Sequence, residues 1–302
     1  MEKAFSVSCW NVEHFGKSRK IGRRSETRAQ VKERIKKVVD FVDQHKGDIL
    51  AISEVSSYEI FETLTKKISN YNFFITEGEQ SQEILVGIKN TLNAYVMQKT
   101  EFKSQQSSLR PGVLVTVHLD DQYYPVLFLH LKSMPDPKGF GLRDDMITRA
   151  CDFRNKIVKG IREKIKVEQG LSSLPKAKDV PAPNYIFVGD LNTMGLDYKP
   201  AKKFDIPPAN EINDLKRRAK NRQMRLLSKT ADATWYNGSN SRYDPGNLDH
   251  VVAMKHLKFM DMGGGAEVKL RGWPEIQDTT EQDKWIEQYS DHALLYFEVC
   301  KV

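Results

Sequence analysis

Short apolar segments that end in an acid, an amide or a histidine recur along the whole chain. In YIFVGDLNT, residues 185–193, four apolar residues run into Gly189 and are followed by Asp190, Asn192 and Thr193. The apolar run indicates a strand that is covered on both faces. Such a strand cannot keep a carboxylate inside at low cost, so Asp190 is expected to emerge at its end, into water, a metal site or a cleft.

Five further apolar segments carry polar residues of this kind at one end, either after or before the apolar run. Their terminal polar residues are Asn11 and Glu13, Glu54, His130, Asp249 and His250, and Asp291 and His292. One such residue alone has an ordinary explanation as a cap or a turn residue. Six strand ends of this kind indicate a site, because a sheet gathers neighbouring strand ends at one rim, where α/β proteins place their ligand crevice. Period-two alternation places His250 on the face opposite Asp249, as a packed residue.

The chain has the features of a globular intracellular protein. Its 302 residues can bury a large core, and no clear boundary divides them. No run approaches the roughly eighteen apolar residues of a membrane span, and MEKAFSVSCW lacks a secretory pattern. Three cysteines in or beside apolar segments indicate reduced core thiols. We therefore expect a cytoplasmic protein without a transmembrane segment.

The positive charge of the chain is concentrated in two segments. The net charge is +7, but residues 17–37 carry +8 and residues 211–229 carry +5, so the remainder carries −6. Concentrated basic segments beside an acidic remainder favour a polyanionic partner, nucleic acid first and an anionic membrane second. Solvated helix faces are the ordinary alternative.

The strand-end motifs carry a resemblance to a known family. WNVE, SEV, HLKS, GDLN, LDHV and SDH occur in this order between Ser8 and Leu295. Together they resemble the endonuclease/exonuclease/phosphatase superfamily, which has the DNase I-like fold. The resemblance implies a four-layer α/β sandwich, with two packed mixed β-sheets flanked by helices, formed by residues 1–302 as a single catalytic domain. It also implies a hydrolase that acts on phosphoric ester bonds with a divalent metal.

The residue types at the strand ends suit this chemistry. Phosphodiester hydrolysis needs charge neutralised on the phosphate oxygens, an activated water and a proton for the leaving oxygen. Oxygen ligands suit Mg²⁺ or Mn²⁺, and Glu54 is the predicted primary ligand. The resemblance adds Asn11 and Asp291 to the metal site. Asp190 with Asn192 would hold a second ion or the attacking water.

The resemblance also implies roles for other residues. His292 faces the phosphate, with Asp249 accepting its other ring proton. His130 occupies the place of a second histidine in DNase I-like nucleases, and Glu77 matches the carboxylate behind it. Which histidine is acid and which is base stays open. Arg110 and Thr234 match positions that lie near the substrate phosphate.

The substrate is predicted from two features: where the sequence differs from particular branches of the superfamily, and where its positive charge lies. His130 stands where abasic-site endonucleases carry a tyrosine-containing loop, and the inositol-phosphatase motif is absent. The basic segments then favour a DNA endonuclease of low sequence specificity, with DNA favoured over RNA. The alternatives are a sphingomyelinase-like or small-molecule phosphodiesterase or phosphatase on the same fold, and an inactive nucleic-acid-binding module.

One basic segment is predicted to bind the DNA backbone. DLKRRAKNRQMRLL, residues 214–227, has a helical apolar stripe that includes Leu215 and Leu226. Arg217, Arg218 and Lys220 would project away from the core and follow the phosphates.

Overall fold

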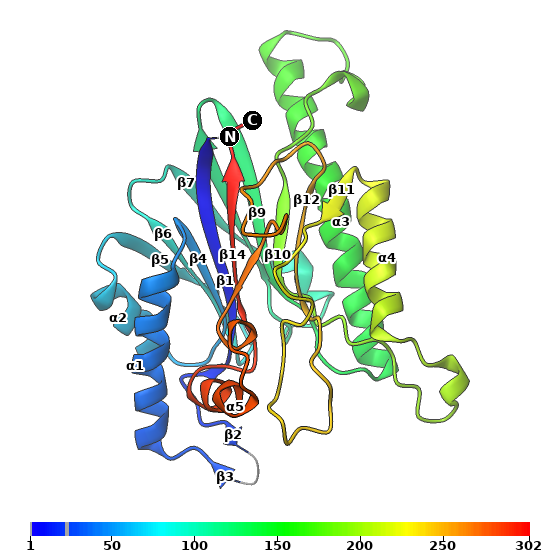
Figure 1. Ribbon diagram of the computed structural model, residues 1–302. Helices are drawn as coiled ribbons and strands as arrows, with labels where there is room; N and C mark the ends of the chain where they lie inside the picture. Colours follow the sequence, from blue (N-terminus) through cyan, green and yellow to red (C-terminus); the bar gives the residue numbers. More distant parts are fainter. Residues whose placement is uncertain (1, 22–23) are drawn as a thin grey trace.

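Two six-stranded β-sheets pack face to face, and helices cover their outer faces (Figure 1). The computed structural model describes residues 2–21 and 24–302. In order across the first sheet lie β13 (Lys269–Arg271), β14 (Leu294–Cys300), β1 (Lys3–Phe15), β4 (Ile49–Val55), β6 (Glu83–Lys89) and β5 (Tyr71–Ile75). Across the second lie β11 (Met224–Leu226), β12 (Asp249–Met254), β10 (Ile186–Asp190), β9 (Gln122–His130), β8 (Gly112–Leu119) and β7 (Ala94–Lys99). β2 (Lys20–Ile21) and β3 (Arg24–Ser25) form a separate short ribbon.

The helices form the two outer layers. The α-helices are α1 (Arg28–His45), α2 (Tyr58–Lys67), α3 (Pro137–Glu168), α4 (Pro208–Asn221) and α5 (Thr279–Gln288), and short 3₁₀ turns span Thr100–Lys103, Ala177–Asp179, Lys202–Phe204 and Trp273–Glu275. One apolar cluster joins α1 and α2 to the outer face of the first sheet. A second cluster fills the space between the sheets and extends to α3 and α4. The predicted four-layer α/β sandwich is confirmed.

Strand β1 is buried more completely than its alternating sequence predicts. Phe5, Val7 and Cys9 alternate with Ser6 and Ser8, a pattern typical of a half-buried strand, yet Ser6 and Ser8 are only 4% and 0% exposed. Their hydroxyls are satisfied locally, because Ser6 Oγ donates to Asp48 Oδ2 at 2.7 Å and Ser8 Oγ donates to the His45 carbonyl at 2.8 Å. Hydrogen bonding thus offsets the cost of burying both hydroxyls in a central strand.

The helix predicted at 214–227 lies six residues earlier in the chain, at Pro208–Asn221, and is followed by a strand. α4 ends at Asn221, Gln223 has φ of 59°, and β11 begins at Met224. Leu226 therefore belongs to the second sheet, where it pairs with Val252, and is not part of the helical stripe. The apolar spacing alone did not distinguish a continued helix from a turn into an edge strand.

Gly189 makes a close approach between β10 and β9 possible. Its φ is +144°, and a Cβ built on it would lie 1.9 Å from the Leu129 carbonyl oxygen. The residues that follow this pair are Asp190 and His130, which are themselves paired. A side chain at position 189 would therefore separate the two strands directly beside both polar ends.

We expect Gly189→Ala to lower the free energy of unfolding by about 1–3 kcal/mol or more, because the backbone of Leu129 must move away from the new methyl group. Urea unfolding measures the change. Gly160→Ala is the matched control: Gly160 lies within α3 with no atom within 4 Å of its built Cβ, so alanine there should be neutral or stabilising. Equal stability of the two variants would contradict the close approach.

Two further predictions concern membrane spans and cysteines. Within residues 2–21 and 24–302, no helix is both long and apolar enough to cross a membrane. Cys9, Cys151 and Cys300 are all buried and unpaired, as their apolar surroundings indicated.

Candidate active site

The polar strand ends meet at one edge of the two sheets. In the second sheet, Asp190 of β10 is paired with His130 of β9 on one side and with Asp249 of β12 on the other. In the first sheet, Asn11 and Glu54 lie on the adjacent parallel strands β1 and β4. Asn11 connects the sheets, because its Nδ2 donates to Asp190 Oδ2 at 3.0 Å and to Glu54 Oε1 at 3.3 Å. Residues from both sheets therefore form one site.

Asp190 is held in place by the turn that follows its strand. Asn192 has a left-handed backbone with φ of 52°, a conformation that asparagine tolerates better than most residues. Its backbone N–H donates to Asp190 Oδ1 and its Nδ2 donates to Asp190 Oδ2, both at 2.9 Å. Burial, with the nearby Asp249 carboxylate, raises the pKa of Asp190 to about 7, although the charge of His292 opposes this. The DLN segment thus presents a fixed carboxylate that can bind a proton near neutral pH.

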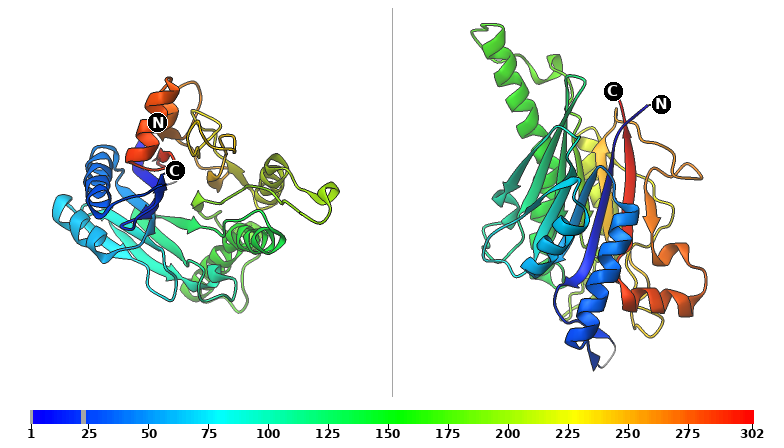
Figure 2. Two further views of the ribbon diagram at one scale, coloured as in Figure 1. Left: turned by 90° about the horizontal axis from the view of Figure 1, so that it is seen from below. Right: turned by 90° about the vertical axis from the view of Figure 1, so that its left-hand side faces the viewer.

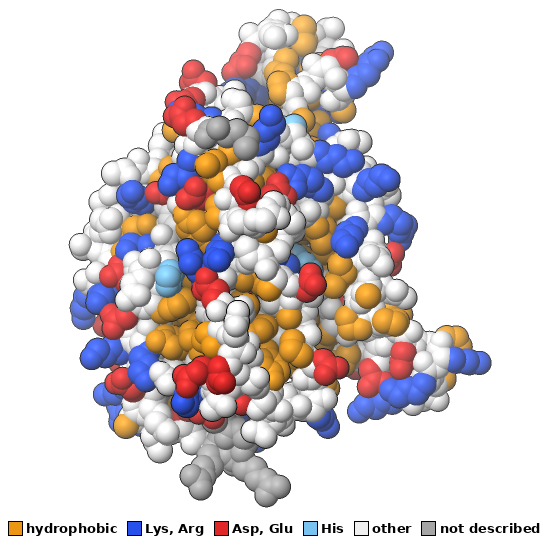
Figure 3. Space-filling model, viewed as in Figure 1, with side chains coloured by type: hydrophobic (Ala, Val, Ile, Leu, Met, Phe, Trp, Pro, Cys, Tyr) orange, Lys and Arg blue, Asp and Glu red, His pale blue; other side chains and the backbone are white. Residues whose placement is uncertain are grey.

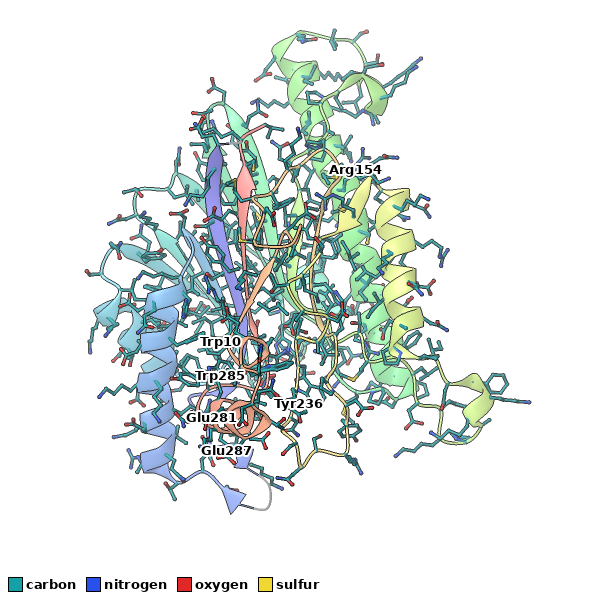
Figure 4. The ribbon with its side chains drawn as sticks, in the orientation of Figure 1. Trp10, Arg154, Tyr236, Glu281, Trp285 and Glu287 are labelled. Atoms are coloured by element: carbon teal, nitrogen blue, oxygen red, sulfur yellow. The ribbon has the colours of Figure 1, made fainter. Side chains whose placement is uncertain are left out.

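His292 and Asp249 form a buried pair. His292 Nδ1 lies 2.8 Å from Asp249 Oδ2, and its Nε2 lies 3.9 Å from Asp190 Oδ2. Burial opposes the charged imidazole, but the carboxylates of Asp249, Asp190 and Asp291 outweigh it and raise the pKa of His292 well above its ordinary value. The Trp10 indole, seen beside Trp285 in Figure 4, donates to the His292 carbonyl at 2.8 Å and fixes its backbone. The bend at Asp291 turns His292 toward Asp249.

His130 lies in the same site but without the predicted carboxylate behind it. Its Nε2 is 3.6 Å from both Glu54 Oε1 and Asp190 Oδ2, and its Nδ1 is buried with no hydrogen-bond partner in the described part of the chain. Burial, with the charge of Arg110 and of His292, lowers the pKa of His130 well below its ordinary value. The imidazole is therefore neutral.

Glu77 does not form the predicted pair with His130. It follows β5, the edge strand of the first sheet, and its side chain is exposed. Its backbone is hydrogen-bonded to the Gln98 side chain in both directions, at 2.8 and 2.9 Å. Since β6 separates β5 from β4, the edge position directs Glu77 to solvent instead of toward the strand ends.

Glu54 and Asn11 provide oxygen atoms that suit a hard cation. Asn11 Oδ1 is buried and has no hydrogen-bond partner within residues 2–21 and 24–302. Glu54 is oriented by its left-handed backbone, with φ of 63°, and its Oε2 accepts from the His14 amide at 2.9 Å and from Gln82 Nε2 at 2.5 Å. Glu54 Oε1 remains directed toward Asn11. The Glu54 carboxylate and the unsatisfied amide oxygen of Asn11 are oxygen donors of the kind that suits Mg²⁺ or Mn²⁺.

A second group of possible metal ligands lies near Glu54 and Asn11. Asp190, Asp249 and His292 form a group whose ligand atoms all lie within 4.8 Å of one another. Within it, Asp249 and Asp190 already accept the hydrogen bonds described above. Asp291 is also engaged, because its Oδ2 accepts from the Trp235 indole at 2.7 Å.

Glu13 was named among the polar strand ends but was given no role in the site. Burial, with the charge of Asp291, raises the pKa of Glu13 to about 7, against the opposing effect of Arg19, which lies 2.8 Å away. Glu54 also contributes to the rise, so three carboxylates lie near one another. The available signal was the spacing in WNVE, because period-two alternation places Asn11 and Glu13 on the same face of β1.

An open, polar pocket of about 400 Å³ adjoins Glu13. One wall comes from residues 237–241, which follow Tyr236, and another comes from α5, including Glu287. Figure 4 labels Tyr236 and Glu287 in this part of the molecule. Most of the side chains that line this pocket are polar or charged, and Glu13 is the residue of the strand-end region that lines it.

Arg110 reaches the opposite part of the site. Its guanidinium donates to the Leu131 carbonyl at 2.7 Å, and burial lowers the pKa of Arg110 while the charges of Glu54 and Asp190 act in the other direction. The proximity of these two carboxylates places its positive charge beside the residues that would meet a phosphate. Arg110 is therefore close to Glu54 and Asp190, and its contact with a substrate phosphate stays a prediction.

Comparison with solved structures identifies the architecture. No family model and no curated protein matches the sequence. The structure is similar to D. rerio TDP2 complexed with single strand DNA product, with a TM-score of 0.59 and 14% identity over 98% of each chain. It is also similar to the 3'-5' exonuclease NExo from Neisseria meningitidis, with a TM-score of 0.57 and 11% identity over 98% of this chain and 100% of that chain. The human Nocturnin catalytic domain gives a TM-score of 0.54 and 14% identity over 98% of this chain and 93% of that chain. The chain has the DNase I-like fold.

Within this DNase I-like fold, Thr234 supports the site from behind. The family resemblance predicted a position near the substrate phosphate for Thr234, but its side chain is completely buried. Thr234 Oγ1 accepts the backbone N–H groups of Leu248 and Asp249, at 3.0 and 2.9 Å. The hydroxyl therefore fixes the start of β12, and with it the carboxylate that holds His292.

We expect Thr234→Val to lower the free energy of unfolding by about 2–5 kcal/mol, because two buried N–H groups lose their acceptor while the side-chain shape is kept. Thr234→Ser retains the hydroxyl and is the matched control. Thermal or urea unfolding of both variants measures the difference. If valine and serine gave equal stability, the two hydrogen bonds would not contribute as described.

The basic residues predicted on α4 are not brought to the site. Arg217 pairs with Asp214 at 3.0 Å, and Arg218 pairs with Asp144 of α3 at 2.5 Å. Lys220 is exposed on the last turn of the helix. Two of the three predicted DNA contacts are thus neutralised by neighbouring acids.

Their position in the DNase I-like fold also separates them from the candidate site. After α4, Met224 of β11 pairs with Met254, whereas the polar end of β12 is Asp249. Five residues of strand correspond to about 17 Å, so the C-terminal end of α4 lies toward the opposite end of the sheet. The first basic segment, residues 17–37, also presents fewer cations to a polyanionic partner than its sequence predicts. Arg19 and Arg34 are buried and bind Glu26.

Proposed function

We propose that this chain is a divalent-metal-dependent phosphodiesterase that cleaves DNA as an endonuclease of low sequence specificity, with residues 1–302 acting as one catalytic domain. The observation that carries the proposal is the buried His292–Asp249 pair next to Asp190. A histidine oriented by one carboxylate and facing another supplies a proton carrier and a proton acceptor within one site.

The protonation states suggest how these residues divide the work. The raised pKa of His292 keeps its imidazole charged at neutral pH, so Nε2 can donate to a phosphate oxygen and stabilise the developing charge. The pKa of Asp190, about 7, allows its ionised form to accept a proton from the attacking water. Arg110 adds a fixed positive charge, and Asn192 orients the Asp190 carboxylate. Neutral His130 can accept a hydrogen bond from a bound water or substrate oxygen.

We propose that Glu54 and Asn11 hold Mg²⁺ or Mn²⁺. The carboxylates of Asp291 and Glu13 lie near Glu54 and add negative charge for the cation. The unsatisfied Asn11 oxygen supports this choice. When bound, the cation supplies Lewis-acid neutralisation of phosphate charge. Because Asn11 also donates to Asp190, the metal residues and the proton acceptor share one support.

Nucleic acid is the substrate class that the comparisons favour. D. rerio TDP2 has been solved with a single-strand DNA product, and a variant of the 3' phosphatase NExo has been solved with a product DNA hairpin. Three buried, unpaired cysteines support a reducing compartment, so we place the proposed activity in the cytoplasm.

The test is a parallel assay of the purified chain with Mg²⁺ or Mn²⁺ on supercoiled plasmid DNA, RNA, sphingomyelin and an inositol phosphate. We expect nicking and degradation of the plasmid without preferred cut sites, and no hydrolysis of the lipid or the inositol phosphate. Hydrolysis of either while DNA stays intact would establish the small-molecule or lipid alternative. DNA binding without any hydrolysis would establish a binding module.

A further inference from the structure

A surface arm follows the GDLN segment and projects from the site end of the molecule. It comprises residues 196–206, and its two ends are joined because the Leu196 and Ile206 backbones exchange hydrogen bonds of 2.8 and 2.9 Å. Figure 1 shows the arm at the lower right, and the view from below in Figure 2 shows it standing out beside the sheets. Tyr198 is six residues beyond Asn192, so its Cα lies within about 20 Å of that site residue.

The base of the arm is rigidly attached. Arg143 of α3 is completely buried, pairs with Glu211 at 3.0 Å and donates to the Gly195 carbonyl at 2.8 Å. Glu211 in turn accepts the Gly195 N–H at 2.6 Å. Gly195 has φ of +77°, and a Cβ there would lie 2.1 Å from the Ile206 oxygen, so the close approach of the two ends requires glycine. The arm is therefore held at a fixed place relative to the catalytic edge.

The far end of the arm combines aromatic and basic side chains. Phe204 is 58% exposed, and its ring meets Tyr198 edge to face at 6.0 Å. Lys203 Nζ lies 5.1 Å from the centre of the Phe204 ring, and Lys199 is exposed nearby in sequence. Lys202 is engaged by Asp197 and Asp205. Figure 3 shows Lys and Arg side chains together with hydrophobic atoms on this projection.

These features fit the recognition of an unpaired nucleic acid strand. An aromatic ring held open to solvent on a rigid support offers a face on which a base can stack, and neighbouring lysines offer charge to the backbone. A duplex fits less well, because its bases are already stacked on one another. We propose that the arm binds the single-stranded part of a DNA substrate, with a base on Phe204 and phosphates at Lys199 and Lys203. The proposal rests on the proposed nuclease function and specifies the form of its substrate.

The test measures binding of a short fluorescent oligothymidylate by anisotropy, in a His292→Ala background that prevents cleavage. Phe204→Ala should weaken binding by about 5- to 150-fold, the effect of losing one stacked base. Phe204→Trp should retain affinity, whereas Phe204→Leu, which is apolar but has no aromatic face, should not. Binding to a duplex of the same length should change much less.

Salt titrations test the lysines. Lys199→Ala with Lys203→Ala should reduce the slope of log affinity against log salt by up to about 1.4 on the single strand. Arg217→Ala with Lys220→Ala on α4 is the matched control, because it removes the same charge at the other end of the sheet. A slope reduced by the control pair and unchanged by the arm pair would overturn the proposal.

Two measurements separate this inference from the proposed function. Hydrolysis of a small chromogenic phosphodiester by the wild-type chain tests catalysis, and the Phe204 and lysine variants should leave it unchanged. If no phosphodiester is hydrolysed, the proposed function fails, while arm-dependent binding of the single strand can still be observed. If Phe204→Ala binds the oligonucleotide as the His292→Ala parent does but loses binding to anionic phospholipid vesicles, the arm is a membrane contact and the inference is wrong.

Discussion

We expect His292→Ala to lower turnover by a factor of about 10²–10⁴, the contribution of a positioned acid or base. The reason is geometric, because the imidazole is held by Asp249 at 2.8 Å and carries a proton beside Asp190. Turnover is measured on plasmid DNA and on a small phosphodiester. Circular dichroism and thermal unfolding should show that the fold is retained.

Two controls make this result specific. Asp249→Asn should cause nearly as large a loss, because its amide cannot accept and orient the ring proton in the same way. His256→Ala removes an exposed histidine just after β12, on the far side from Asp249, and should leave turnover unchanged. Added imidazole should restore part of the His292→Ala activity if the missing group carries a proton. If a His292→Ala enzyme that is free of contaminating nuclease retained its activity, the assignment of His292 as a catalytic residue would be wrong.

Removing the Glu54 charge should abolish most metal-dependent activity. Glu54 Oε1 and the unsatisfied Asn11 Oδ1 are the oxygens that we propose for the cation. Changing a residue that only orients a metal ligand weakens metal affinity by roughly 10- to 100-fold. Glu54→Gln alters the proposed ligand itself, so it should weaken Mg²⁺ affinity by more than this. Calorimetric Mg²⁺ titration measures this directly, and chelation of the wild-type enzyme should abolish hydrolysis.

Glu77→Gln is the matched control for this substitution. It makes the same chemical change at the exposed residue that the sequence analysis paired with His130. We expect unchanged Mg²⁺ affinity and turnover. Unchanged Mg²⁺ affinity in Glu54→Gln would show that the ligand lies elsewhere, and a large loss of turnover in Glu77→Gln would restore the His130–Glu77 pair.

The strand-end residues illustrate what could be predicted. The alternation of apolar segments with polar termini located Asn11, Glu54, Asp190 and Asp249, because strand ends must expose charged groups and a sheet collects them at its rim. The spacing in WNVE also contained Glu13, although it was not selected. The four-layer sandwich followed from the family resemblance and is confirmed by the arrangement of the two sheets.

Other features depended on contacts between distant segments. Thr234 was expected beside the phosphate, but packing buries it under Asp249, 15 residues away. Arg218 was expected to bind DNA, but α3 supplies Asp144 from 74 residues away. Neither partner could be identified from local spacing, since a side chain's exposure depends on which element covers it.

The sequence by itself determined which residue types are available for the proposed chemistry and which kinds of element carry them. Residue type and period are local properties, and they are the same in any arrangement of the strands. The tertiary structure decided which groups meet: it paired His292 with Asp249 and left His130 without Glu77. It also fixed the base of the arm next to the GDLN segment, while the C-terminal end of α4 lies toward the other end of the sheet. Those outcomes depend on sheet order, strand register and helix packing, which are set by interactions between residues far apart in the chain.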